Sequence, residues 1–241
     1  MSLRNGLTGL AAALLPLVAG AASSTAPQPP PSTVLFENVR VFDGQSARLS
    51  ASSYVLVVGN AIQSISTQAI APPAGSPLTR IQGGGRTLMP GLIDNHVHIA
   101  LSTTGQADLL SDATTMDVLQ ARAAAEAGDM LMRGFTSVRD MGGPMLTARP
   151  AIDKGELPGP RIYGSGAMIS QTSGHGDSRL PQERSRRFFG EVSKGEQLGA
   201  NYIADGRDEV LTATRENLRA GATQIKVMAG GGAASAYDPL D

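Results

Sequence analysis

Two histidines separated by one residue lie at the end of an apolar stretch, in the run DNHVH at positions 94–98. Side chains in a strand alternate between its two faces, so the rings of His96 and His98 should share one face while Val97 points to the other. Two imidazole nitrogens placed in this way can reach one metal ion, and neutral imidazole suits Zn²⁺ and similar cations. A His-x-His pair is also common as a structural or exposed feature. Its position at the C-terminal end of a predicted strand, where parallel α/β proteins build their active sites, favours the metal-ligand interpretation.

A lysine, Lys226, interrupts the otherwise apolar run Ile225–Met228, which is followed by glycines at 230–232. Buried strands of parallel sheets are continuous apolar runs, and an unpaired ammonium inside one is costly. Two interpretations remain open. The side chain can extend to solvent or pair with a carboxylate. Alternatively, the amine reacts with carbon dioxide to give a carbamate, which is chemically a carboxylate and can bridge two metal ions.

The third histidine, His175, is flanked by Gly174 and Gly176, which allow the backbone and the ring to approach a ligand closely. A glycine-rich turn with an incidental histidine is the alternative. All three histidines of the chain lie at predicted strand ends or in the loops that follow them. This clustering favours a single site.

Other kinds of site find little support in the sequence. No phosphate-binding G-x-x-x-x-G-K-[ST] or G-x-G-x-x-G pattern is completed, and no G-x-S-x-G motif is present, although Ser165 lies between two glycines. Cysteine is absent, so any metal must bind to histidine, carboxylate or other oxygen ligands. A net charge of -1 and the absence of tryptophan argue against a nucleic-acid partner.

The elements that would position these residues fall into two regions. Short β-rich runs at 34–44, 52–66 and 79–91, separated by turn residues, predict a small β unit. From Met89 onward, strands alternate with helices; the strands are expected at 92–100, 136–140, 161–170 and 223–229, and the helices at about 116–132, 149–154 and 209–220. This alternation predicts parallel α/β architecture, either an open doubly wound sheet or the first half of a (β/α)8 barrel. The long polar segment 171–208 follows a strand end, where α/β enzymes build substrate pockets.

The N-terminus has the pattern of a secretory signal. A positively charged start, an apolar stretch and the small residues Ala19–Ala21 predict a signal peptide over 1–21, followed by a flexible linker over 22–32. The apolar stretch is too short for a membrane span and contains Pro16. We therefore expect export to the periplasm or the cell exterior, with no stable membrane span after cleavage.

Four stretches taken together, TLMPGLIDNHVHIA, TSVRDMGG, QTSGHGD and IKVMAGGG, resemble the amidohydrolase superfamily. The similarity is to its imidazolonepropionase-like and Xaa-Pro dipeptidase or carboxypeptidase branch, which is related to ochratoxin-hydrolysing amidohydrolases. The resemblance implies an α/β fold: a small β-sandwich-like domain, whose N-terminal portion is residues 33–88, followed by a metal-dependent (β/α)8 barrel, whose first half is 89–241.

The resemblance also implies a chemistry. His96 and His98 would hold the first of two divalent metal ions, with Zn²⁺ the expected metal, and Lys226, carbamylated by carbon dioxide, would bridge both. The implied reaction is hydrolysis of the amide bond of dipeptides, N-acyl amino acids or ochratoxin-like amides by a hydroxide that bridges the metals. His175 and Tyr237, on loops at the expected pocket mouth, are predicted to bind the substrate. The intact protein is expected to form a homo-oligomer.

One part of the family pattern is missing. It requires two further histidines after the fifth and sixth strands and an aspartate after the eighth, yet no histidine follows His175. We therefore expect the barrel to be truncated after about its fourth strand and the activity to belong to the intact protein. The alternatives are an inactive or weakly metal-binding fragment and a cyclic-amide hydrolase or deaminase of the same superfamily.

Overall fold

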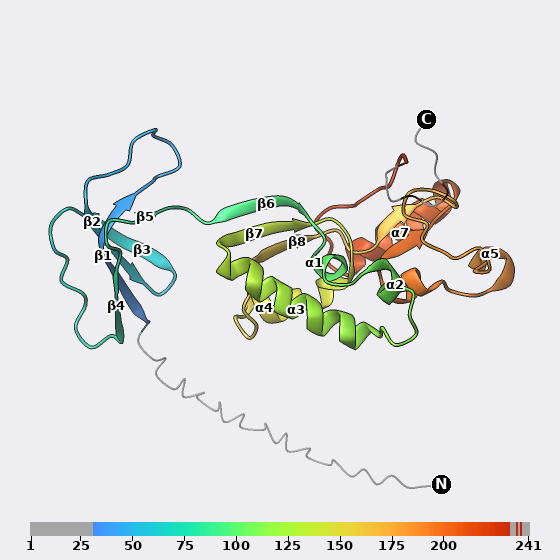
Figure 1. The fold of residues 1–241 in the computed structure, drawn as a ribbon, viewed down its shortest axis with the longest axis horizontal. Coiled ribbons are helices and arrows are strands. Elements are labelled where there is room, and N and C mark those ends of the chain that lie inside the picture. Colours follow the sequence, from blue (N-terminus) through green and yellow to red (C-terminus); the bar gives the residue numbers. More distant parts are fainter. Residues whose placement is uncertain (1–30, 232–234, 236, 238–241) are drawn as a thin grey trace, which may run out of the picture. The chain divides into compact units, whose positions relative to one another are not determined.

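The computed structural model describes residues 31–231, 235 and 237, and the chain divides between Met89 and Pro90 into two compact units (Figure 1). The predicted signal peptide and nearly all of the predicted linker lie outside the described residues. Among the residues described, no helix combines the length and hydrophobicity needed to cross a membrane.

The N-terminal unit is built on one mixed sheet, in which two strand pairings are antiparallel and two are parallel. Its strands are β1 (Thr33–Val41), β2 (Ser53–Val58), β3 (Ala61–Ser66), β4 (Leu78–Gln82) and β5 (Thr87–Leu88). The order is β3-β2-β1-β4, with β4 parallel to β1 and β5 pairing with the end of β1. The apolar residues Leu35 and Val39 of β1 and Val55 and Leu56 of β2 are buried, with Leu35 opposite Leu56.

The second unit contains the parallel strands. β6 (Leu92–Val97), β7 (Phe135–Asp140) and β8 (Arg161–Gly164) form a sheet in that order, and β9 (Met168–Ser170) pairs with β10 (Asn201–Ile203). The helices are α1 (Ile99–Ser102), α2 (Gln106–Leu109), α3 (Met116–Met132), the 3₁₀ turn η1 (Pro144–Thr147), α4 (Arg149–Asp153), α5 (Arg186–Phe189), α6 (Lys194–Gln197) and α7 (Gly206–Arg219).

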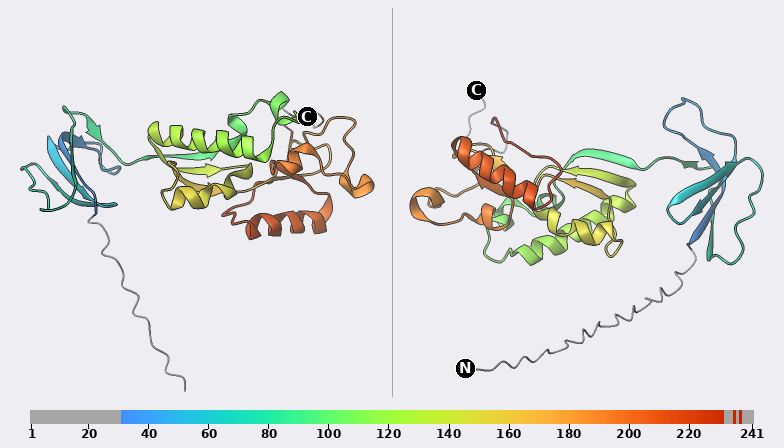
Figure 2. Two further views of the ribbon diagram at one scale, coloured as in Figure 1. Left: turned by 90° about the horizontal axis from the view of Figure 1, so that it is seen from below. Right: turned by 180° about the vertical axis from the view of Figure 1, so that it is seen from behind.

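Helix α3 fixes one face of the sheet. Thr115 caps it by accepting a hydrogen bond from the amide of Val118, and an apolar stripe that includes Leu119 and Ala127 is buried along its length. The stripe packs in one core cluster with Val138 of β7, Ile162 of β8 and Ile152 of α4. The C-terminal ends of β6 to β8 therefore have fixed relative positions, and the segment 171–208 lies beyond these ends (Figure 2).

Two strand predictions are wrong in part. The strand expected at 92–100 ends at Val97, because the chain turns into α1 and buries Ile99 in the core. The strand expected at 161–170 is broken into β8 and β9, since Gly166 has a φ of +71° and the Asn217 side chain, instead of a neighbouring strand, bonds the amide and carbonyl of Ala167.

The strand expected at 223–229 is reduced to a single parallel bridge between Val227 and Ile169. Ile169 donates to the carbonyl of Lys226 at 2.9 Å and accepts from the amide of Met228 at 2.8 Å. Within the described part of the chain this segment pairs only on the side of Ile169, and Val227 is 56% exposed. The segment still lies beside β9 in the parallel direction, so Lys226 follows the same edge of the fold as the histidine pair.

Candidate functional site

The structure brings His96 and His98 together at the C-terminal end of β6. Their ring centroids lie 5.3 Å apart and the rings are tilted by 58°. The ring of His96 is exposed, whereas that of His98 is half-buried. The strand alternation on which the prediction relied therefore holds up to Val97, and two imidazoles face the same space.

The surroundings of His98 favour its neutral form. Burial lowers the pKa of His98, a nearby Gly142 carbonyl opposes this, and the positive charges of His96 and Lys226 lower the pKa further. Nδ1 of His98 lies 3.4 Å from the Gly142 oxygen. Neutral imidazole is the metal-binding form. A side chain at Gly142 would be strained, because its φ is +152° and a Cβ there would lie 2.5 Å from Met168 Cγ and 3.3 Å from His98 Nδ1.

Lys226 lies near the histidine pair, since its positive charge lowers the pKa of His98. It is half-buried, and within residues 31–231 its ammonium forms no ion pair. The carboxylate partner that would make Lys226 a simple structural cation is thus not found among the described residues.

A cavity of about 620 Å³ adjoins the histidine pair. Its wall is mostly apolar, with Glu126 the one acid in it; it is formed by His96, Val97, His98, Ile99, Leu101, Ser102, Glu126, Met130, Met168 and Met228. Such a cavity suits the apolar part of a ligand whose polar group faces the imidazoles.

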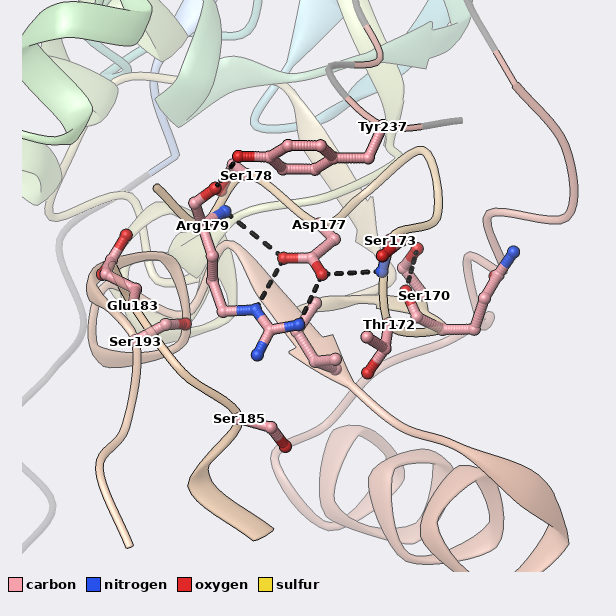
Figure 3. Close-up of polar contacts among 12 residues, drawn as sticks. Ser170, Thr172, Ser173, Asp177, Ser178, Arg179, Glu183, Ser185, Ser193 and Tyr237 are labelled. Atoms are coloured by element: carbon pink, nitrogen blue, oxygen red, sulfur yellow. Dashed lines mark hydrogen bonds and ion pairs between the residues drawn. The ribbon is translucent and has the colours of Figure 1, made fainter. Parts of the chain in front are cut away.

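His175 and Tyr237 both make polar contacts with residues distant in the sequence, and Tyr237 lies beside Arg179, in the loop that carries His175 (Figure 3). Nδ1 of His175 is 2.5 Å from Oγ of Ser235, and the Tyr237 hydroxyl donates to the carbonyl of Arg179 at 3.0 Å. A Cβ on Gly176 would lie 3.2 Å from Met228 Cγ, so the His175 loop packs against a residue of the cavity wall. No hydrogen bond among the described residues joins His175 to His96 or His98.

Sequence reasoning missed Asp140, the last residue of β7. It is 1% exposed, and neither carboxylate oxygen has a hydrogen-bond partner among the described residues. The amides of Ile99 and Gly142 lie near enough to favour the charged form but make no hydrogen bond of normal geometry; burial outweighs them and raises the pKa of Asp140 to about 7. The available signal was its position, since Asp140 ends the strand adjacent to that of His98.

This burial predicts an unusual pH dependence of stability. A carboxyl whose folded pKa is raised from 3.8 to about 7 stabilises the fold below pH 3.8, and that contribution is lost as pH rises through 7. The difference in free energy of unfolding between Asp140→Asn and the wild type should therefore shift in favour of the variant by about 2–3 kcal/mol from pH 5 to pH 8. Urea unfolding of the metal-free protein at both pH values measures this shift. Asp153→Asn, at an exposed carboxylate, is the control, and an Asp140→Asn gain independent of pH would contradict the assignment.

The donor set fits part of a metal site. His96 and His98 offer two adjacent imidazoles, one of them held neutral. In the described part of the chain, however, no group of three or more His, Cys, Asp or Glu residues could hold a metal ion. A catalytic zinc site has three protein ligands, so the imidazoles of His96 and His98 could supply at most two of them, with Lys226 nearby.

Several known proteins are similar to this chain in sequence and fold. The model of the amidohydrolase family matches residues 87–239. The ochratoxinase of Aspergillus niger is 39% identical over 156 residues, which are 63% of this chain and 32% of that protein. Among solved structures, a prolidase complexed with N-methylphosphonate-L-proline has a TM-score of 0.74 and 33% identity over 87% of this chain and 49% of its own. The A. niger ochratoxinase structure has a TM-score of 0.67 and 29% identity over 87% and 49%. The chain thus spans one third to one half of the length of these relatives.

Proposed function

This chain belongs to the amidohydrolase family, and on that premise we propose that it forms the N-terminal part of a metal-dependent hydrolase that cleaves the amide bond of dipeptides or N-acyl amino acids. The observation that carries the proposal is the neighbouring pair His96 and His98 beside an apolar cavity. Lys226 is near enough for its charge to lower the pKa of His98. The remaining residues of such an enzyme would come from outside this half of the fold.

His96 and His98 would bind the first of two divalent cations, with Zn²⁺ the expected ion, and Lys226 as a carbamate would contribute an oxygen to each. Bound metal would lower the pKa of water and polarise the scissile carbonyl. Burial keeps the His98 ring unprotonated and able to act as a ligand. His175 and Tyr237 would face the substrate carboxylate, because the His175 loop packs against Met228 of the cavity wall and Tyr237 is bonded to Arg179 of the same loop.

The substrate class follows from the shape and polarity of the site. Met168 and Met228 provide adaptable apolar surface for a bulky acyl, aromatic or prolyl group. Relatives of this chain include an ochratoxinase and a prolidase. We therefore place N-acyl amino acids with a bulky acyl group, ochratoxin-like amides and Xaa-Pro dipeptides in the proposed range.

A second candidate applies to the 241 residues alone, and the incomplete donor set favours it. With two imidazoles and no group of three or more His, Cys, Asp or Glu residues able to hold a metal ion in the described residues, this segment by itself would bind a divalent cation weakly and lack turnover. The two candidates are distinguished by comparing the activity of this segment with that of the full-length protein.

The test compares the 241-residue chain with the full-length protein, each loaded with Zn²⁺, on an N-acyl amino acid, an Xaa-Pro dipeptide and a cyclic amide. We expect amide cleavage by the full-length protein alone. Ammonia release or ring opening without cleavage of the first two substrates would instead indicate the deaminase or cyclic-amide branch. Equal activity in both proteins would contradict the idea that ligands from outside this segment are needed.

A further inference from the structure

An ion pair inside the loop that carries His175 has no part in the site described so far. Arg179 donates from Nε to Oδ1 of Asp177 at 2.7 Å and from Nη2 to Oδ2 at 2.6 Å (Figure 3). The two side chains are only 10% and 3% exposed. Bidentate pairing of this kind fixes the orientation of both groups as well as their separation.

The same pair fixes the backbone that leads to His175. Asp177 Oδ2 also accepts the amide of Ser173 at 2.8 Å, and Ser173 adopts a φ of +61°, which is rare for a residue with a side chain. At the start of the loop, Asp205 accepts the amide of Thr172 at 2.9 Å and its hydroxyl at 2.6 Å. The two carboxylates therefore accept the amides of consecutive residues, Thr172 and the strained Ser173.

Arg179 also connects this loop to the segment that follows Lys226. Its carbonyl accepts the Tyr237 hydroxyl at 3.0 Å, while the His175 ring contacts Ser235. Tyr237 is thus bonded to one residue of the ion pair (Figure 3), and His175 lies two residues before the other, Asp177, in the chain. Movement of Arg179 would displace Tyr237 directly and His175 through Asp177.

The charges around Arg179 indicate whether this residue binds the substrate itself or positions other side chains. The hydrogen bond to Asp177 raises the pKa of Arg179 against the opposing effect of burial, and the charges of Asp177, Glu196 and Asp205 add to the rise. Asp177 pairs with the guanidinium through both of its oxygens, so the positive charge of Arg179 is already compensated by a carboxylate of its own loop. A substrate carboxylate would gain little from this cation, so Arg179 is suited to orient other groups.

We propose that the Asp177–Arg179 pair is a positioning device that presents His175 and Tyr237 to the free carboxylate of the substrate. This inference rests on the proposed amide hydrolysis. If it is correct, breaking the pair should weaken binding of substrates with a terminal carboxylate and leave substrates without one unaffected, because the reacting amide is handled by other residues.

Steady-state kinetics of the full-length, Zn²⁺-loaded protein test the proposal with an N-acyl amino acid and its C-terminal primary amide. Asp177→Asn should raise KM for the acid about tenfold, with kcat and the KM for the primary amide changed less than about threefold. Arg179→Lys keeps the charge but not the bidentate geometry and should give an intermediate rise. Asp153→Asn, which removes the exposed Arg149–Asp153 pair of α4, is the matched control and should change nothing.

A readout that needs no turnover is the ¹⁵N NMR signal of the His175 ring, assigned by its absence in His175→Ala. It should shift or broaden in Asp177→Asn while the signals of His96 and His98 stay in place. If the wild type cleaves neither substrate, the proposed function is wrong. The NMR result would then test the positioning role of the ion pair by itself. Unchanged acid KM with an unchanged His175 signal would overturn the inference, as would an equal rise in KM for acid and primary amide. If Asp177→Asn does not fold, Arg179→Lys decides by the same criteria.

Discussion

His96→Ala and His98→Ala should each lower turnover of the full-length protein at least about a hundredfold, because each removes one of two adjacent ligands of the same cation. The rings lie 5.3 Å apart on one strand end, so neither can replace the other without displacing β6. The measurement pairs kcat/KM with metal content by elemental analysis, since loss of a ligand should lower both.

His175→Ala is the matched control, because it removes the same side chain from the same unit of the fold. Its ring contacts Ser235 and not the histidine pair. Metal content should therefore remain at the wild-type level, while KM for carboxylate substrates rises. Normal turnover with full metal content in either His96→Ala or His98→Ala would exclude that histidine from the site.

The histidine pair could be predicted because its geometry is local. Alternation along one strand places His96 and His98 on one side whatever the rest of the fold does, and the structure keeps that strand to Val97. Helix α3 could be predicted with its limits, 116–132, for a similar reason. The Thr115 cap and the buried apolar stripe both depend only on residues close together in the sequence.

Features that depend on distant partners could not be predicted. The break between β8 and β9 exists because Asn217, fifty positions away, satisfies Ala167 in place of a neighbouring strand. Segment 223–229 has the composition of a strand, yet a strand needs a partner along its length, and the described residues provide one bridge.

Asp140 and Arg179 show the same limit at the site itself. As a sequence, Asp140 is a polar residue that ends a strand; its isolation depends on burial by surrounding elements, which composition does not reveal. Arg179 is one arginine of many in a polar segment, and its pairing with Asp177 distinguishes it only once the loop is folded. Sequence patterns thus pointed to side chains expected to face a ligand, but not to the buried carboxyl and the ion pair beside them.

Lys226→Ala should abolish most activity of the full-length protein, and short carboxylic acids added to the buffer should restore part of it. As an unmodified amine, Lys226 carries a positive charge that already disfavours protonation of His98, and it would repel a metal cation in the same way. A carbamate reverses that charge and offers two oxygens, which hard and borderline cations accept. Acetate or propionate in the vacated space would supply the same oxygens without the covalent link.

The backbone makes this rescue feasible. The carbonyl of Lys226 and the amide of Met228 are both bonded to Ile169, so the segment is held in place by groups that the substitution leaves intact. The side chain itself forms no ion pair within residues 31–231 whose loss would destabilise the fold. Lys154→Ala, at an exposed lysine after α4, controls for loss of a cation and should retain activity with no response to added acid.

Lys226→Arg separates carbamate chemistry from charge and packing. Arginine keeps a positive charge of similar reach but does not form the carbamate, so this variant should be as inactive as Lys226→Ala and unresponsive to added acid, because its side chain fills the space. Incubation with ¹³C-labelled carbon dioxide should give a carbamate signal in the metal-loaded wild type that is missing in both variants. An active Lys226→Arg enzyme, or a wild type that lacks the labelled signal at full activity, would show that position 226 supplies charge or packing, and the two metal ions would then need a different bridge.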